Sequence, residues 1–156
     1  MYSPSQSDMR AVSSIRPSAP QRIVSEQRSR NMAAVRRSDT KLELRVRSLL
    51  HRRGLRYRKD YPVRIAGRLI RPDVVFTRSK IAVFIDSCFW HLCPKHGQIP
   101  SSNRAFWKDK LERNAARDRE QTEALKSEGW TVLRIWEHMP TEDAVQIIVN
   151  AARGNP

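Results

Sequence analysis

The chain has 156 residues and a formal net charge of +14, and its length fits one domain with a modest core better than two. Such a positive charge favours a polyanionic partner, foremost nucleic acid, because each phosphate that is neutralised releases condensed counterions. An anionic membrane surface is the weaker alternative, since no segment approaches the ~20 apolar residues that span a bilayer.

Residues 1–27 contain seven Ser and three Pro but no Gly and few apolar residues. This composition predicts a flexible, basic Ser/Pro-rich arm, because the segment cannot bury enough surface to offset the entropy of ordering. The remainder, 28–156, is expected to form a single domain. No apolar run of a signal peptide precedes it, so the expected location is cytoplasmic, with the nucleoid as the site of action.

The first predicted helix spans about residues 40–53. Thr40 and Glu43 have the spacing of a capping box, and Gly54 supplies a stop signal. Apolar side chains recur at helical spacing along one face. They are Leu42, Val46, Leu49 and Leu50.

Two short strands follow, VVF at 74–76 and IAVFI at 81–85, joined by the tight turn TRSK. An earlier strand is possible at about 55–63. Residues 88–100, which contain two Pro and a Gly, are expected to form a loop.

A long helix is predicted over about 103–128, a strand over 131–136, and a closing helix over 143–152 begun by Thr141. Core packing is the favoured role for Phe106, near the start of the long helix. The resulting order of elements predicts an α/β fold with a mixed sheet flanked by helices. The inward-facing residues of the long helix are expected to be Trp107, Leu111, Ala115, Thr122 and Leu125.

Two aspartates stand at the ends of the predicted hairpin. Asp73 precedes its first strand and Asp86 follows its second, so both should lie at the same end of the sheet. Carboxylate oxygens at one sheet end suit Mg²⁺, which can activate water and neutralise charge on a phosphodiester. The alternative is that both residues only cap turns.

The loop carries the pattern C-x4-C-x2-H, formed by Cys88, Cys93 and His96. Structural zinc takes four Cys or His ligands, usually from two chain segments. His138 follows directly after the strand 131–136 and is the predicted fourth ligand, which makes the zinc structural. The alternative is two free buried cysteines and two surface histidines.

Three further residues of the loop have no place in this zinc site. His91 is available as a general base on an attacking water. Phe89 and Trp90 beside it are either the loop's apolar plug or a wedge that inserts between DNA bases.

The region 28–137 resembles the very short patch repair endonuclease family. The CFWH motif followed by a Cys/His cluster is the most specific part of the resemblance. The matching pieces are RSRNM (28–32), DTKLE (39–43), RPD (71–73), CFWH (88–91), FWKDKLERN (106–114), RD (117–118) and GWTVLRIWE (129–137).

The resemblance implies a restriction-endonuclease-like core with a structural zinc. It implies nicking of one strand 5′ to the thymine of a T·G mismatch left by deamination of 5-methylcytosine. The expected partner is double-stranded DNA with such a mismatch, together with mismatch-repair proteins, and the enzyme is expected to act as a monomer.

Roles follow from the resemblance position by position. Asp73 would be the Mg²⁺ ligand, His91 the general base, and Glu43 would lie at the edge of the metal site. Cys88, Cys93, His96 and His138 occupy the zinc positions. The expected DNA-binding residues are Phe89, Trp90 and Trp107 in the base stack, Met32, Lys110 and Asn114 at the mismatched pair, and Arg28 and Arg30 of the basic stretch.

Asp86 departs from the family, because the best-known member has a histidine at this position. The argument from the hairpin makes Asp86 a direct or water-mediated Mg²⁺ ligand. Two other functions stay open at this stage. One is a zinc-stabilised DNA-binding protein without catalysis, and the other is a related nuclease of restriction or defence.

Overall fold

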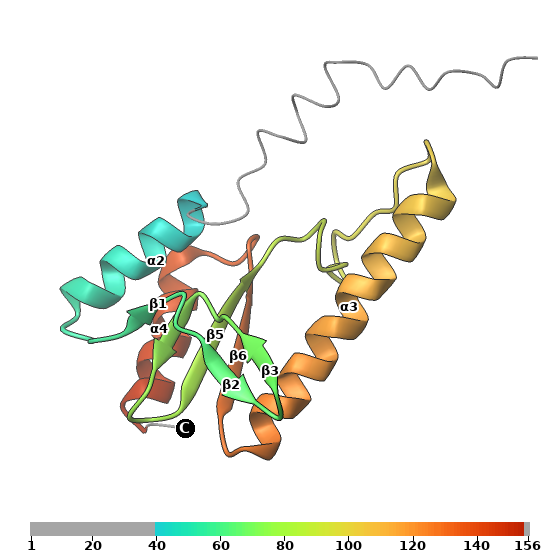
Figure 1. The fold of residues 1–156 in the computed structure, drawn as a ribbon. Helices are drawn as coiled ribbons and strands as arrows, with labels where there is room; N and C mark the ends of the chain where they lie inside the picture. The colour runs from blue at the N-terminus through green and yellow to red at the C-terminus, as the bar shows by residue number, and fades with distance from the viewer. Residues whose placement is uncertain (1–39, 155–156) are drawn as a thin grey trace, which may run out of the picture. The chain divides into compact units, whose positions relative to one another are not determined.

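The structure is a computed structural model that describes residues 40–154 (Figure 1). The expectations for the arm 1–27 and for Arg28, Arg30 and Met32 lie outside the described residues. None of the described helices is long and apolar enough to cross a membrane.

A four-stranded sheet with the order β1-β4-β5-β6 forms the middle layer (Figure 1). β1 pairs with β4 and β4 with β5 in antiparallel fashion, whereas β5 and β6 run parallel. The predicted mixed sheet flanked by helices is therefore confirmed. The strands are β1 (Arg58–Lys59), β4 (Val74–Phe76), β5 (Ile81–Asp86) and β6 (Thr131–Trp136).

Helices α2 (Lys41–Arg52) and α4 (Thr141–Ala152) cover one face of the sheet. Alternation along the strands turns Val74, Val83 and Ile135 toward these helices, because successive strand residues point to opposite faces. The helices contribute side chains from their apolar faces to the same cluster. These are Val46, Leu50, Ala144, Val145, Ile148 and Val149.

The opposite face is covered by α3 (Arg104–Ser127) and by a small hairpin of β2 (Val63–Ile65) and β3 (Arg68–Ile70). A second apolar cluster fills this side, and Leu125 is the buried residue that α3 contributes to it. Its other buried members are Val63, Ile65, Ile70, Val75, Ala82 and Phe84. This face also carries the even-numbered residues of β5 and β6, and therefore Asp86 and Arg134.

The helix predictions are confirmed with small shifts at the ends. Thr40 is the N-cap of α2, and its hydroxyl oxygen accepts from the backbone N–H of Glu43 at 3.3 Å. The same hydroxyl donates to Glu43 Oε1 at 3.0 Å, so the two residues are coupled through their side chains.

Three details of the structure differ from what the sequence predicts. The expected strand at 55–63 is reduced to Arg58–Lys59, and the hairpin of β2 and β3 was not predicted. Phe106 is not a core residue, because 46% of it is exposed at the start of α3. That end of the helix, the yellow part of α3, extends beyond the sheet (Figure 1).

Candidate active site and metal centre

Asp73 precedes β4 and is tied to the neighbouring strand through both its backbone and its side chain. Its N–H donates to the carbonyl of Val83 at 2.9 Å, and its Oδ2 accepts from the N–H of Ile85 at 2.7 Å. The carboxylate is thus held at the end of the sheet where β5 finishes with Asp86. The two aspartates share this end, as the hairpin argument expected.

The environment of Asp73 opposes its ionisation. Burial, together with the nearby carboxylates of Glu43, Asp86 and Asp60, raises its pKa to about 6, although the hydrogen bond from Ile85 acts in the opposite direction. Glu43 itself is 4% exposed and lies 3.6 Å from Arg47 Nη1. Buried carboxylates that repel one another are the setting in which a divalent cation binds favourably.

Asp86 has a different set of neighbours from the one expected. Its two oxygens accept from Nε and Nη2 of Arg134 at 2.5 and 2.9 Å, and its side chain is only 3% exposed. A cation bound by Asp86 would have to compete with this bidentate pair. The direct ligation of Mg²⁺ by Asp86 therefore stays a prediction that the observed contacts do not favour.

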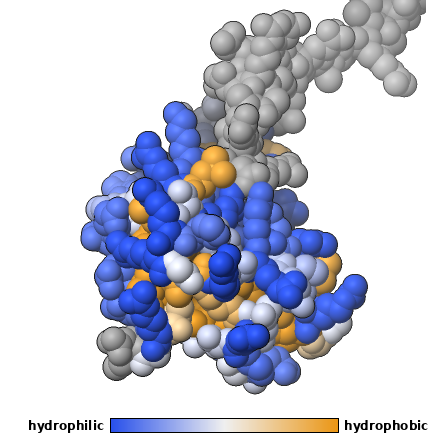
Figure 2. All heavy atoms as spheres, turned by 90° about the vertical axis from the view of Figure 1, so that its left-hand side faces the viewer, coloured by the Kyte–Doolittle hydropathy of each residue, from blue (hydrophilic) through white to orange (hydrophobic). Residues whose placement is uncertain are grey.

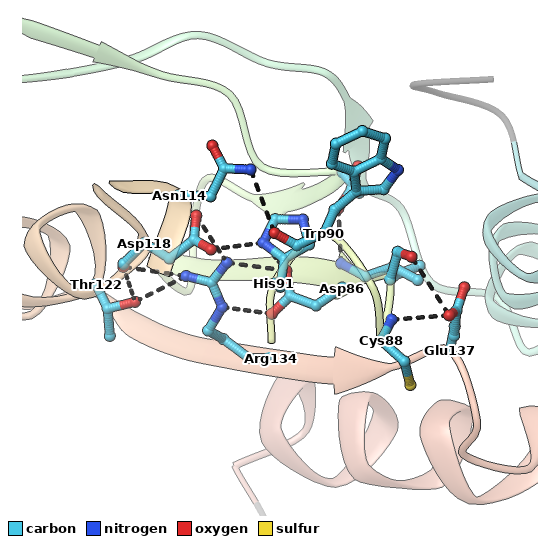
Figure 3. Close-up of polar contacts among 12 residues, drawn as sticks. Asp86, Cys88, Trp90, His91, Asn114, Asp118, Thr122, Arg134 and Glu137 are labelled. Carbon is cyan, nitrogen blue, oxygen red and sulfur yellow. Dashed lines mark hydrogen bonds and ion pairs between the residues drawn. The ribbon is translucent and has the colours of Figure 1, made fainter. Parts of the chain in front are cut away.

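His91 forms a dyad with Asp118 of α3 (Figure 3). Its Nδ1 lies 2.5 Å from Asp118 Oδ2 and 3.7 Å from Asp86 Oδ1, and the imidazole is 25% exposed. Burial works to raise the pKa of Asp118, but the hydrogen bond from His91 and the charges of His91, Arg134 and Arg117 hold that pKa below its ordinary value. An ionised Asp118 accepts from Nδ1–H, which leaves Nε2 of a neutral imidazole free to take a proton.

Cys88, Cys93, His96 and His138 converge as the sequence predicted. Their ligand atoms all lie within 4.8 Å of one another. Three come from the loop after β5, and His138 comes from the turn after β6. The Nδ1 of His138 lies 3.1 Å from Cys88 Sγ and 3.7 Å from Cys93 Sγ.

The donor set and its spacing fit a tetrahedral cation. Bond lengths of about 2.3 Å to sulfur and 2.0–2.1 Å to nitrogen separate tetrahedral ligand atoms by roughly 3.3–3.8 Å. The sulfur–nitrogen distances within the cluster run from 3.1 to 3.9 Å. Two thiols and two imidazoles can hold a metal here with no position left open for catalysis.

The loop of this cluster is also fixed by Glu137 at the end of β6. Glu137 Oε1 accepts from the N–H of Cys88 at 2.8 Å and from the hydroxyl of Ser87 at 3.3 Å. At Gly97 any side chain is excluded, because an added Cβ would lie 2.6 Å from the carbonyl oxygen of Cys93. His91 therefore lies in a segment that is fixed on one side by the bonds to Glu137 and on the other by the Cys/His cluster.

Aromatic rings from the loop and from α3 meet beside the dyad. Phe89 lies 5.0 Å from Trp90 and 5.5 Å from Trp107, measured between ring centroids. Lys110 Nζ lies 5.3 Å from the Trp90 ring, and Asn114 Nδ2 donates to the Trp90 carbonyl at 3.3 Å. The structure thus brings together all the aromatic and polar residues predicted for DNA contact within the described part of the chain.

Helix α2 borders a strongly hydrophilic surface. Seen from the side of α2 and α4, hydrophilic side chains cover most of the molecule, with smaller apolar areas between them (Figure 2). The exposed basic residues of α2 are Lys41, Arg45 and Arg52.

Three residues of the site were not identified from the sequence as functional. In the sequence, Asp118 is part of the matched dipeptide RD, Arg134 lies in a predicted strand, and Thr122 lies in the predicted long helix. One signal was present: Arg134 interrupts the otherwise apolar run VLRIW. A cation at a strand position that faces a covering helix needs partners there.

A family model described as DNA mismatch endonuclease Vsr matches residues 22–96. The chain is 52% identical over 124 residues to the type II nicking enzyme V.NaeI of Lentzea aerocolonigenes, covering 79% of this chain and 75% of that protein. It is 40% identical to the type II nicking enzyme V.XorIIP of Xanthomonas oryzae pv. oryzae, covering 74% and 83%. It is 37% identical to the DNA mismatch endonuclease Vsr of Escherichia coli strain K12, covering 70% and 69%. The chain belongs to the Vsr family of DNA endonucleases.

Proposed function

We propose that the protein is a Mg²⁺-dependent endonuclease that nicks one strand 5′ to the thymine of a T·G mismatch, as in very short patch repair of deaminated 5-methylcytosine. We also propose that its fold is restriction-endonuclease-like and that its Cys₂His₂ cluster binds structural zinc. The observation that carries the proposal is the meeting of a hydrogen-bonded His–Asp dyad and a partly buried aspartate at one end of the sheet.

His91 is the proposed general base. Asp118 fixes the proton on Nδ1, so Nε2 can accept a proton from the attacking water as the phosphorus–oxygen bond of the leaving strand breaks. Asp118 also stabilises the imidazolium that forms, because its carboxylate lies 2.5 Å from Nδ1.

Asp73 is the proposed Mg²⁺ ligand, with Glu43 at the edge of the same site. When bound there, Mg²⁺ would supply a Lewis acid that polarises the phosphodiester and makes water easier to deprotonate. The chain's own contribution is to hold an aspartate at a fixed position: the Asp73 N–H donates to the Val83 carbonyl, and the Ile85 N–H donates to Asp73 Oδ2.

Phe89, Trp90 and Trp107 are the proposed wedge. The Phe89 ring meets both tryptophan rings edge to face, and the two tryptophan rings are tilted against each other. Lys110 beside them adds positive charge for the DNA. Inserting rings between bases costs unstacking energy, and that cost is smallest at a weakly paired mismatch. Selectivity for T·G pairs would follow from this difference.

A role in DNA restriction rather than repair is the second candidate. Five relatives with 39–52% identity are named type II nicking enzymes, and one relative with 37% identity is named a DNA mismatch endonuclease. Their names also favour cleavage of one strand over both. Binding without catalysis has less support, since it gives no reason for the His91–Asp118 dyad.

The test is a strand-resolved nicking assay on duplexes that differ in one pair, T·G or C·G, with and without Mg²⁺. We expect nicking only of the T·G duplex, only with Mg²⁺, and only in the thymine strand. Asp73→Asn and His91→Ala should each lower the rate by at least about 100-fold while DNA binding persists. Equal nicking of the C·G duplex would support the restriction role, and wild-type rates in both variants would refute the proposed site.

A further inference from the structure

Arg134 is a charged residue within the apolar strand β6. The parallel register pairs it with Phe84, and its Cζ lies 4.8 Å from the centroid of that ring. Because side chains at alternate positions share a face, Asp86 lies two residues further along β5 on the same side. The guanidinium lies over the Phe84 ring and faces Asp86 and the His91–Asp118 dyad (Figure 3).

The N–H donors of the guanidinium have acceptors on every side of its plane. Nε and Nη2 bond the two oxygens of Asp86, and Nη1 donates to the Asp118 carbonyl at 3.1 Å and to Thr122 Oγ1 at 3.2 Å. Nη2 also lies 3.4 Å from Asp118 Oδ1. Five N–H groups in a planar fork thus meet acceptors from β5 and α3, an arrangement that a lysine cannot reproduce.

The two oxygens of Asp118 have different partners. Oδ1 faces Arg134 and Oδ2 faces His91 Nδ1, so rotation of the carboxylate would break one or both contacts. The backbone of Asp118 is held by the same arginine through its carbonyl. Arg134 therefore fixes both the position of this turn of α3 and the orientation of its carboxylate.

We propose that Arg134 is a positioning residue for the nicking reaction, that it orients Asp118 toward His91, and that Asp86 serves to hold Arg134 in place. The inference rests on the proposed function, in which His91 is the general base. It also gives Asp86 a role that needs no contact with the metal.

Stability alone is a poor explanation of this network. A buried ion pair contributes little net stability, because desolvation offsets the attraction, and apolar residues of similar volume often replace such a pair without loss. A guanidinium that donates to a carboxylate, a carbonyl and a hydroxyl at the same time fixes the relative positions of these groups more than it stabilises the fold. Losing Arg134 alone leaves Asp86 as an unpaired buried carboxylate, so Arg134→Met should melt at a lower temperature than wild type. Below that temperature, its cost is expected in the nicking rate and not in DNA affinity.

The test measures the single-turnover nicking rate with Mg²⁺, the dissociation constant for the same duplex without Mg²⁺, and the melting temperature. Arg134→Met and Arg134→Lys are expected to lower the rate at least about 30-fold, with the dissociation constant changed less than about threefold. Arg68→Met is the matched control, since Arg68 also joins a strand to α3, through Glu120 at 2.7 Å, but on an exposed surface. Its nicking rate should stay within about twofold of wild type.

A double variant separates positioning from general support of the fold. If Arg134 acts through Asp118, the variant with both Arg134→Met and Asp118→Asn should nick no more slowly than Asp118→Asn alone. Multiplied losses would overturn the inference, as would a wild-type rate in Arg134→Met. If Arg134→Met does not fold, Thr122→Val decides instead, because it removes one acceptor at nearly constant volume. It should slow nicking severalfold, and an unchanged rate would overturn the inference.

His91→Ala, assayed beside these variants, distinguishes failure of the proposed function from failure of the inference about Arg134. Normal nicking by His91→Ala would refute the proposed base and this inference with it. An inactive His91→Ala together with a fully active Arg134→Met would refute the inference alone.

Discussion

The Asp73 side chain accepts a hydrogen bond that fixes it, but its surroundings disfavour its charged form. Its Oδ2 accepts from Ile85 N–H, yet burial and the neighbouring carboxylates raise its pKa to about 6. In an unfolded chain the same group titrates near ~3.9. The folded state thus binds this proton more tightly, so the contribution of Asp73 to the free energy of unfolding is most favourable below pH ~4 and is lost as the pH rises through about 6.

Asp73→Asn should therefore stabilise the Mg²⁺-free protein at neutral and alkaline pH. The amide keeps an acceptor for Ile85 N–H and removes the charge. We expect its free energy of unfolding in urea to exceed that of wild type by on the order of 2 kcal/mol at about pH 8, and the difference to vanish near pH ~4. Added Mg²⁺ should stabilise wild type and leave Asp73→Asn unchanged. A variant less stable than wild type at about pH 8 would contradict this account.

The loop between β5 and α3 is held mainly by polar contacts and not by the two apolar clusters. Neither apolar cluster includes Cys88 or Cys93. The loop is held instead by the Cys/His cluster, by Glu137 and by the dyad. Loss of the metal should consequently loosen this loop while the sheet and its helices persist.

His138→Ala tests this expectation, with His51→Ala as its control. His51 is an exposed histidine of α2 that lies outside the cluster. His138→Ala should lose the bound zinc, lower the melting temperature and abolish nicking, while its far-ultraviolet circular dichroism stays near that of wild type. His51→Ala should retain one zinc per chain and full activity. Full zinc content in His138→Ala, measured by atomic emission, would refute the ligand assignment.

The elements differ in how far the sequence predicts them. α2, β4, β5 and β6 were predictable because their apolar periodicity and turn signals lie within a few residues. The hairpin of β2 and β3 was missed because its strands are three residues long and its turn is Ala66–Gly67, both with positive φ, in place of the usual Asn-Gly.

The same distinction applies to the site. The Cys/His cluster was predictable because three of its residues lie within nine positions and the fourth, His138, follows a recognisable strand. The link from Arg134 to Asp118 was not, because it depends on the register of β5 against β6 and on which turn of α3 passes above them. Contacts that depend on tertiary packing are only weakly visible in the local sequence. Here the only signal is a cation in an apolar strand.

The charge of the whole molecule is unevenly distributed along the chain. Residues 1–60 carry 15 Lys and Arg against 5 Asp and Glu, residues 61–120 carry 12 against 6, and residues 121–156 carry 3 against 5. The net values are +10, +6 and −2. DNA binding should therefore depend most on residues 1–120, and its sequence-independent part should fall steeply with salt.

A chain that begins at Arg28 tests whether residues 1–27 are an arm separate from the catalytic domain. Both apolar clusters, the Cys/His cluster and the dyad lie within 40–154, so the shortened chain should keep the melting temperature and the nicking rate at saturating DNA. The deleted segment holds three cations, Arg10, Arg16 and Arg22. Since each phosphate contact contributes about 0.9 to the slope of log K against log salt, that slope should decrease by at most about 3 for a matched duplex. The full-length chain with these three arginines changed to Gln should show the same decrease, because charge and not length sets the effect. A fall in melting temperature on deletion, without one in the Gln variant, would instead make the segment part of the folded domain.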